Sequence, residues 1–113
     1  QAFIDRYFGT REALRGLVVV MDIRHPLKDY DLQMLGYAAE RGLPAHGLLT
    51  KADKLGRGQQ MQTLQKVKKE VSSRFGDSVT VQTYSGESRQ GVDELRGIVG
   101  GWLGLDVEPP ADA

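Results

Sequence analysis

The sequence predicts an α/β fold in which a parallel sheet of three strands is flanked by helices. Three short runs rich in apolar and β-branched residues, 17–21, 44–49 and 78–83, have the length and composition of strands. Each run is followed by a longer segment whose apolar residues recur every three or four positions, as in amphipathic helices. Strands that alternate with helices fold into parallel sheets with right-handed crossovers.

The three predicted strands differ in how deeply they are expected to be buried. Run 17–21 (LVVVM) is apolar throughout, which is typical of strands covered on both faces. Run 44–49 is shorter and weaker, and run 78–83 alternates, so one of its faces is expected to be more solvated. The first strand therefore suits a central position. At an edge of the sheet, it would instead be able to pair with another chain and form a dimer.

Glycines mark the ends of two predicted helices. The apolar stripe after the first strand ends at Gly42, and the stripe after the second ends at Gly76. The third stripe runs from Val92 to Trp102, and a further helix is predicted near Phe3. We expect residues 1–103 to form one domain and residues 104–113, which contain Glu-Pro-Pro and no apolar pattern, to be a disordered tail.

The composition excludes several classes of function. The 113 residues include 15 basic and 15 acidic side chains, so no net charge favours nucleic acid or a membrane surface. The absence of cysteine excludes disulfides and thiolate sites and fits a cytoplasmic protein. No apolar run approaches the roughly 20 residues of a membrane span, and no signal peptide is evident. The chain begins with Gln1 rather than methionine, so it is either processed or a piece of a longer protein.

The turn after the second strand predicts a guanine-binding site. It contains Thr50, Lys51, Ala52 and Asp53, and such turns lie where open α/β sheets bind ligands. The two oxygens of the Asp53 carboxylate match the adjacent ring N–H and amine of guanine, a pair that adenine lacks. The stem of Lys51 would lie across the purine ring, or Lys51 is simply a solvated surface lysine. Thr50 would hold neighbouring turns together, or it is an ordinary strand end.

The turn after the third strand is expected to contact the same base. Tyr84, Ser85 and Gly86 come just before a helix, where exposed backbone N–H groups can bind a carbonyl oxygen such as that of guanine. The alternative is a structural loop with Ser88 as the helix cap. Because turns after neighbouring parallel strands converge at one end of the sheet, Asp53 and Ser85 are expected to lie close together.

Two other segments have structural alternatives that we favour. Residues 22–26 (DIRHP) follow the first strand at the same end of the sheet, but no second histidine or carboxylate stands at metal-ligand spacing from His25. We therefore expect a structured turn in which Asp22 accepts backbone N–H groups, and we predict no catalytic and no metal-binding residue. The helix predicted around 57–75 has a basic face, which binds a phosphate backbone or is merely solvated; its basic residues are Arg57, Lys66, Lys68, Lys69 and Arg74.

The phosphate-binding loop of nucleotide enzymes is missing from these 113 residues. There is no G-x-x-x-x-G-K-[ST] loop in the sequence. A base pocket without a phosphate pocket cannot transfer phosphoryl groups. The chain is therefore either the C-terminal half of a GTPase or a protein with another function. As such a half, it is expected to bind nucleotide weakly on its own.

Three ordered motifs give the chain a specific resemblance. Residues 17–26 (LVVVMDIRHP), 48–55 (LLTKADKL) and 84–91 (YSGESRQG) closely resemble the EngB family of small bacterial GTP-binding proteins, over residues 1 to about 103. The resemblance implies half of a P-loop GTPase fold, the half that contains the guanine pocket. Thr50, Lys51 and Asp53 match the family's guanine-specificity motif. Tyr84, Ser85 and Gly86 match its second base-contacting turn, where the family commonly has two serines.

The resemblance also implies a function for the intact protein. EngB-like proteins bind GTP and GDP with Mg²⁺, hydrolyse GTP slowly, assist assembly of the large ribosomal subunit, and are needed for normal cell division and septation. The family's Mg²⁺ ligands match nothing in this chain. The alternative is a non-enzymatic α/β domain that binds rRNA or protein through its basic helix. A flavodoxin-like receiver or redox domain is disfavoured, because the chain has neither an acidic cluster nor a phosphate-binding loop.

Overall fold

The three predicted strands form one parallel sheet. The computed structural model describes residues 14–104. Within them the sheet order is β1 (Leu17–Asp22), β2 (Ala45–Thr50), β3 (Val79–Thr83), so β2 lies in the middle. The strands are parallel and paired along almost their full lengths, so their carboxyl ends lie at the same end of the sheet. The predicted α/β class with a parallel three-strand sheet is confirmed.

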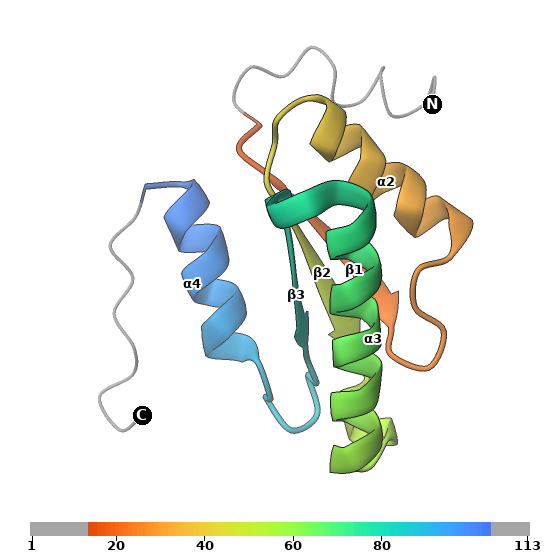
Figure 1. Ribbon diagram of the computed structural model, residues 1–113. Helices are drawn as coiled ribbons and strands as arrows, with labels where there is room; N and C mark the ends of the chain where they lie inside the picture. Colours follow the sequence, from red (N-terminus) through yellow and green to blue (C-terminus); the bar gives the residue numbers. More distant parts are fainter. Residues whose placement is uncertain (1–13, 105–113) are drawn as a thin grey trace.

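A helix follows each strand, as predicted (Figure 1). Both glycines predicted to close helices have positive φ, +67° at Gly42 and +71° at Gly76, a conformation that glycine adopts without strain. The helix expected near Phe3 and residues 105–113 of the expected tail lie outside the described residues. The elements are α2 (Asp29–Glu40), η1 (Ala52–Lys54), α3 (Arg57–Phe75), η2 (Gly76–Ser78) and α4 (Val92–Trp102).

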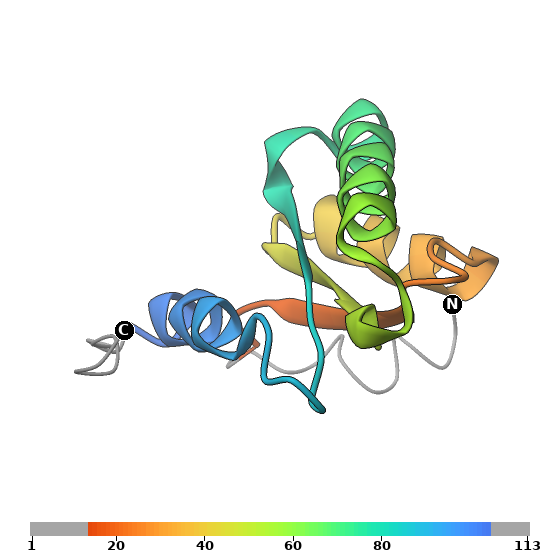
Figure 2. The same ribbon diagram turned by 90° about the horizontal axis from the view of Figure 1, so that it is seen from below.

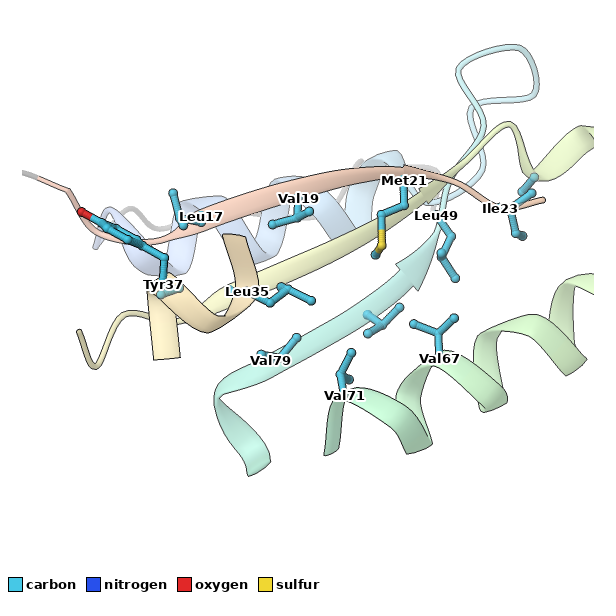
Figure 3. Close-up of a cluster of buried hydrophobic side chains, with 14 residues drawn as sticks. Leu17, Val19, Met21, Ile23, Leu35, Tyr37, Leu49, Val67, Val71 and Val79 are labelled. Carbon is cyan, nitrogen blue, oxygen red and sulfur yellow. The ribbon is translucent and has the colours of Figure 1, made fainter. Parts of the chain in front are cut away.

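The main core lies between one face of the sheet and the helices α2 and α3 (Figure 3). Alternate strand residues point to the same face, which explains why Val19 and Met21 of β1 lie together on it. They belong to one buried cluster with Leu35 of α2 and with Val67 and Val71 of α3. This packing fixes α3, whose first turn follows directly after the turn 50–54.

The opposite face of the sheet lies beneath α4, which Figure 2 shows apart from α2 and α3. A Cβ atom on Gly16 would come within 2.6 Å of the Trp102 ring, so the chain before β1 approaches α4 closely. A hydrogen-bonded polar group is buried on this face: the His46 imidazole contacts Thr80 Oγ1 at 2.6 Å and Gln82 Oε1 at 2.7 Å. Only part of β3 is solvated as expected, since Thr80 is exposed and Gln82 is buried.

The most apolar strand, β1, lies at an edge of the sheet rather than at its centre. Its side chain Val20 is 61% exposed, which is unusual for a valine in the middle of a strand. Of the two positions that the sequence left open for this strand, the structure therefore shows the edge. None of the helices within residues 14–104 is both long enough and apolar enough to span a membrane.

Candidate functional site

Three turns meet at the carboxyl end of the sheet, one after each strand. Backbone hydrogen bonds join them directly: Ile23 N–H donates to Thr50 O at 3.0 Å, and Tyr84 N–H donates to Leu49 O at 2.8 Å. In return, Ala52 N–H donates to Tyr84 O at 3.0 Å. The turn after β2 is thus held between its two neighbours by main-chain bonds, which leaves its side chains available for other contacts.

Asp53 and Ser85 are in direct contact, although 32 residues separate them. Ser85 Oγ donates to Asp53 Oδ1 at 2.6 Å, and Ser88 N–H donates to Ser85 Oγ at 3.2 Å. Ser85 is fully buried and Asp53 is exposed, so the serine supports the carboxylate from behind. This hydrogen bond lowers the pKa of Asp53, with smaller contributions from Lys54 and Arg24. The carboxylate is therefore ionised at neutral pH.

Lys51 and Thr50 have clear structural roles in the same turn. Lys51 adopts the left-handed conformation, with φ of 60°, which non-glycine residues adopt mainly in tight turns. Its side chain is 60% exposed, and Nζ lies 3.8 Å from Asp22 Oδ2. Thr50 Oγ1 donates to Met21 O at 3.0 Å. Thr50 therefore joins β2 to the end of β1, whereas the link to the turn after β3 comes from the backbone.

The turns surround a cavity of about 500 Å³, a size typical of small-molecule sites. Five of the six predicted site residues line it, and the sixth, Ser85, lies behind Asp53. The sequence reasoning missed three further residues in the wall. The complete wall is Arg24, Thr50, Lys51, Asp53, Lys54, Tyr84, Gly86 and Glu87. A larger cavity of about 610 Å³, between the turn after β1 and α3, adjoins it at Arg24.

Two glutamine side chains connect the turns from behind, and the sequence reasoning missed both. Gln60 of α3 donates from Nε2 to the carbonyl oxygens of Ala52 and Leu55, at 2.8 and 3.0 Å. Gln90 donates from Nε2 to Gln60 Oε1 at 2.8 Å and to Thr83 Oγ1 at 2.9 Å. Carbonyl acceptors in a neighbouring turn leave no sequence signature, so only the folded chain identifies this pair.

The turn after β3 does not contain the helix cap at Ser88 that the structural alternative predicted. Helix α4 begins at Val92 after Gly91, so Ser88 is not its N-cap residue. Gly86 is exposed, and a Cβ atom added there would meet nothing within 4 Å. The site therefore has room for a small side chain such as serine at position 86.

The turn after β1 is a structured turn, as we expected. Asp22 Oδ1 accepts the backbone N–H of Arg24 at 2.9 Å, and His25 is exposed. Within residues 14–104, no group of three histidine, cysteine or acidic side chains could hold a metal ion. The basic residues of α3 are exposed, and Arg74 forms an ion pair with Glu70 at 2.6 Å.

Comparison with known proteins gives very similar relatives. The chain is 99% identical over all 113 residues to a protein of Xanthomonas campestris pv. campestris named "Probable GTP-binding protein EngB". It is 96% identical over 111 residues to the protein of that name from Xanthomonas axonopodis pv. citri, and 76% identical over 106 residues to the one from Stenotrophomonas maltophilia. The chain belongs to the EngB family. No protein-family model matches it.

The chain spans about half the length of these EngB relatives. It covers 55% of the Xanthomonas campestris protein, 52% of the Xanthomonas axonopodis protein and 53% of the Stenotrophomonas maltophilia protein, while between 94% and 100% of the chain is matched. The EngB sequence therefore continues in these relatives beyond the three strand–helix units described above.

Solved structures support the same fold. The chain is similar to part of translation elongation factor SelB from Methanococcus maripaludis in complex with the GTP analogue GppNHp, with a TM-score of 0.66 and 18% identity. The match covers 85% of this chain and 22% of SelB; the apo form gives a TM-score of 0.66 over 87% of this chain and 22% of SelB. The EngB chain thus shares the α/β arrangement of part of SelB.

Proposed function

We propose that this chain supplies the guanine-binding half of a GTP-binding protein, and that the cavity between the turns after β2 and β3 holds the base of GTP or GDP. The observation that supports this most directly is the 2.6 Å hydrogen bond from Ser85 to Asp53 at the cavity wall. It places an ionised carboxylate and the turn 84–86 on the same cavity. A purine with a matching set of donors and acceptors could contact the carboxylate and the turn at once.

The chemistry of the wall favours guanine. Asp53 offers two acceptor oxygens to the ring N–H and the amine of the base. The Tyr84 and Ser85 N–H groups donate to Leu49 O and Gln90 O, so the Gly86 N–H is the group that would donate to the carbonyl oxygen of guanine. Tyr84 and Gly86 both line the cavity. The aliphatic stem of Lys51 would cover one face of the ring while its ammonium group stays in water. Adenine would present an amine where the turn requires an acceptor.

Nucleotide phosphates and Mg²⁺ are not expected to be held by the residues described here. Within residues 14–104, no group of three or more acidic, histidine or cysteine side chains could hold a metal ion. We propose that the phosphate and Mg²⁺ contacts belong to the part of the longer relatives that this chain does not span. Slow GTP hydrolysis is accordingly proposed for the whole protein.

We test base recognition on the full-length Xanthomonas campestris relative, because it is 99% identical to this chain over all 113 residues of the chain. Isothermal titration is expected to show binding of GDP and no binding of ADP at the same concentration. Competition with guanosine should weaken GDP binding, and competition with adenosine should not. Equal binding of GDP and ADP would contradict the proposal.

By family resemblance, we further propose that the whole protein acts in the cytoplasm in assembly of the large ribosomal subunit and is needed for cell division and septation. The exposed basic face of α3 is the feature of this chain that supports an RNA contact. The alternative, a non-enzymatic binding domain that acts through this face alone, would not need the purine cavity. The two functions therefore depend on different residues.

Charge reversal on α3 separates these functions. Replacing Lys66, Lys68 and Lys69 with glutamate should weaken association with the large ribosomal subunit at least tenfold, because three phosphate contacts are lost and repulsion is added. GDP affinity should stay within about twofold of the wild-type value, because none of the three lines the purine cavity. Co-sedimentation with purified subunits and GDP titration measure the two effects. Unchanged co-sedimentation would exclude α3 as the contact surface.

The edge strand β1 also supports a proposal about assembly. Its outer edge is not paired within residues 14–104, and Val20 on it is exposed, so two copies of this chain are proposed to dimerise edge to edge. Sedimentation equilibrium of the chain should show a dimer that Val20→Lys abolishes. Only monomer at every concentration would rule the dimer out.

A further inference from the structure

One carboxylate links two cations at the mouth of the purine cavity. Asp22, at the end of β1, accepts from Arg24 Nε at 3.0 Å through Oδ1 and from Arg24 Nη2 at 2.8 Å through Oδ2. The same Oδ2 lies 3.8 Å from Lys51 Nζ. A fork-to-fork pair of this kind fixes the plane of a guanidinium group as well as its position.

The contact with Lys51 is more informative than the contact with Arg24. Arg24 is two residues from Asp22, and a local pair of this kind occurs in many turns. Lys51 comes from the turn after the next strand, where it adopts a left-handed conformation, and its ammonium group lies near Asp22 at the end of β1. Without a partner, an exposed lysine side chain samples many rotamers, and holding it over a ligand costs conformational entropy.

Arg24 is itself part of the cavity wall. It lines the cavity together with Asp53, and it is one of the groups whose charge lowers the pKa of Asp53. The pKa of Asp22 lies well below its ordinary value, mainly because of the hydrogen bonds from Arg24, so Asp22 is an anion at any pH near neutrality. Its attraction for both cations therefore persists under all ordinary conditions.

We propose that Asp22 is a positioning residue of the purine site, which holds the Lys51 ammonium and the Arg24 guanidinium on one side of the cavity before the nucleotide arrives. Arg24 becomes a further wall of the base pocket, because a planar guanidinium can lie against a purine ring. This inference rests on the proposed function and adds a third turn, the one after β1, to base recognition.

The test compares variants of the full-length Xanthomonas campestris relative at the positions aligned with this chain, using GDP as the probe. Asp22→Asn keeps the shape and removes the charge, and it should lower GDP affinity roughly threefold to tenfold. Arg24→Ala should lose a similar factor. Arg24→Lys should recover only part of it, because lysine keeps the charge and loses the fork. Arg96→Ala, exposed on α4 and outside the cavity wall, is the matched control and should bind normally.

A double-mutant cycle separates positioning from a merely structural role. In a Lys51→Met background, the fold-loss of GDP affinity caused by Asp22→Asn should be less than half of the fold-loss that it causes when Lys51 is present. The preference for guanine over xanthine should not change in Asp22→Asn, because Asp53 is intact, and the melting temperature should match that of the control. An undiminished loss in the Lys51→Met background, or a loss that tracks a fall in melting temperature, would assign Asp22 a structural role and overturn the inference.

The outcome for Asp22 can be told apart from the outcome for the site as a whole. If Asp22→Asn and Arg24→Ala bind GDP within twofold of the wild-type protein while Asp53→Asn does not, the inference is wrong and the guanine site stands. If Asp53→Asn also binds GDP normally, the proposed function itself is wrong.

Discussion

Asp53→Asn is expected to lower the affinity of the full-length protein for GDP roughly 100-fold or more and to create affinity for xanthosine diphosphate. The asparagine amide retains one acceptor oxygen and replaces the second carboxylate oxygen with an NH₂ donor. That donor meets the amine of guanine, so two donors face each other. Xanthine has a carbonyl oxygen at this place and accepts from the new amide. Titration with both diphosphates measures the switch.

The change in specificity should occur without a change in folding. Asp53 is exposed, and the asparagine carbonyl can still accept from Ser85 Oγ, so the melting temperature should stay close to the wild-type value. Ser85→Ala provides the complementary variant: it removes the support of the carboxylate while leaving both acceptor oxygens. It should weaken GDP binding without favouring xanthine. Equal GDP binding by Asp53→Asn and the wild-type protein would exclude Asp53 as the base-specificity residue.

Gly91→Ala is expected to have the largest effect on stability, about 3 kcal/mol or more. Gly91 has φ of +83°, and a Cβ atom there would lie 2.3 Å from Thr83 O and 2.5 Å from Gln82 Nε2. Gln82 Nε2 donates to the carbonyls of Thr83 and Gly91 at 3.0 and 2.9 Å, so the clash would break the bonds that close the turn 84–91. Urea denaturation of this chain measures the loss of unfolding free energy.

A matched glycine separates the clash from the cost of the backbone conformation alone. Gly42 has φ of +67°, and a Cβ atom there would meet nothing within 4 Å. Gly42→Ala should therefore cost only about 1 kcal/mol, the penalty for a left-handed alanine. Equal losses for the two variants would show that the turn around Gly91 relaxes, and that steric exclusion does not explain this glycine.

The sequence was a reliable guide wherever local chemistry decides the structure. Periodicity and composition predicted all three strands and the three helices that follow them, and glycine marked two helix ends at Gly42 and Gly76. These features depend on interactions between near neighbours in the chain, and the three strands reappear in the structure within one residue of their predicted bounds.

Features that depend on contacts between distant residues could not be predicted from the sequence. Nothing in LVVVM distinguishes a central strand from an edge strand, because its hydrophobicity is the same in both positions. The amides of Gln60 and Gln90 and the cavity wall at Arg24 likewise depend on partners far along the chain or in adjacent turns.

For the candidate site, residue types and their order along the chain were enough to nominate Asp53 and Ser85 and to suggest that their turns converge. The tertiary structure alone decided that Ser85 stands behind the carboxylate and that the Lys51 ammonium lies 3.8 Å from Asp22 Oδ2. The physical reason is that a parallel sheet brings strand ends together by topology, whereas the direction of each side chain is set by packing and hydrogen bonds that form only when all three strands are in place.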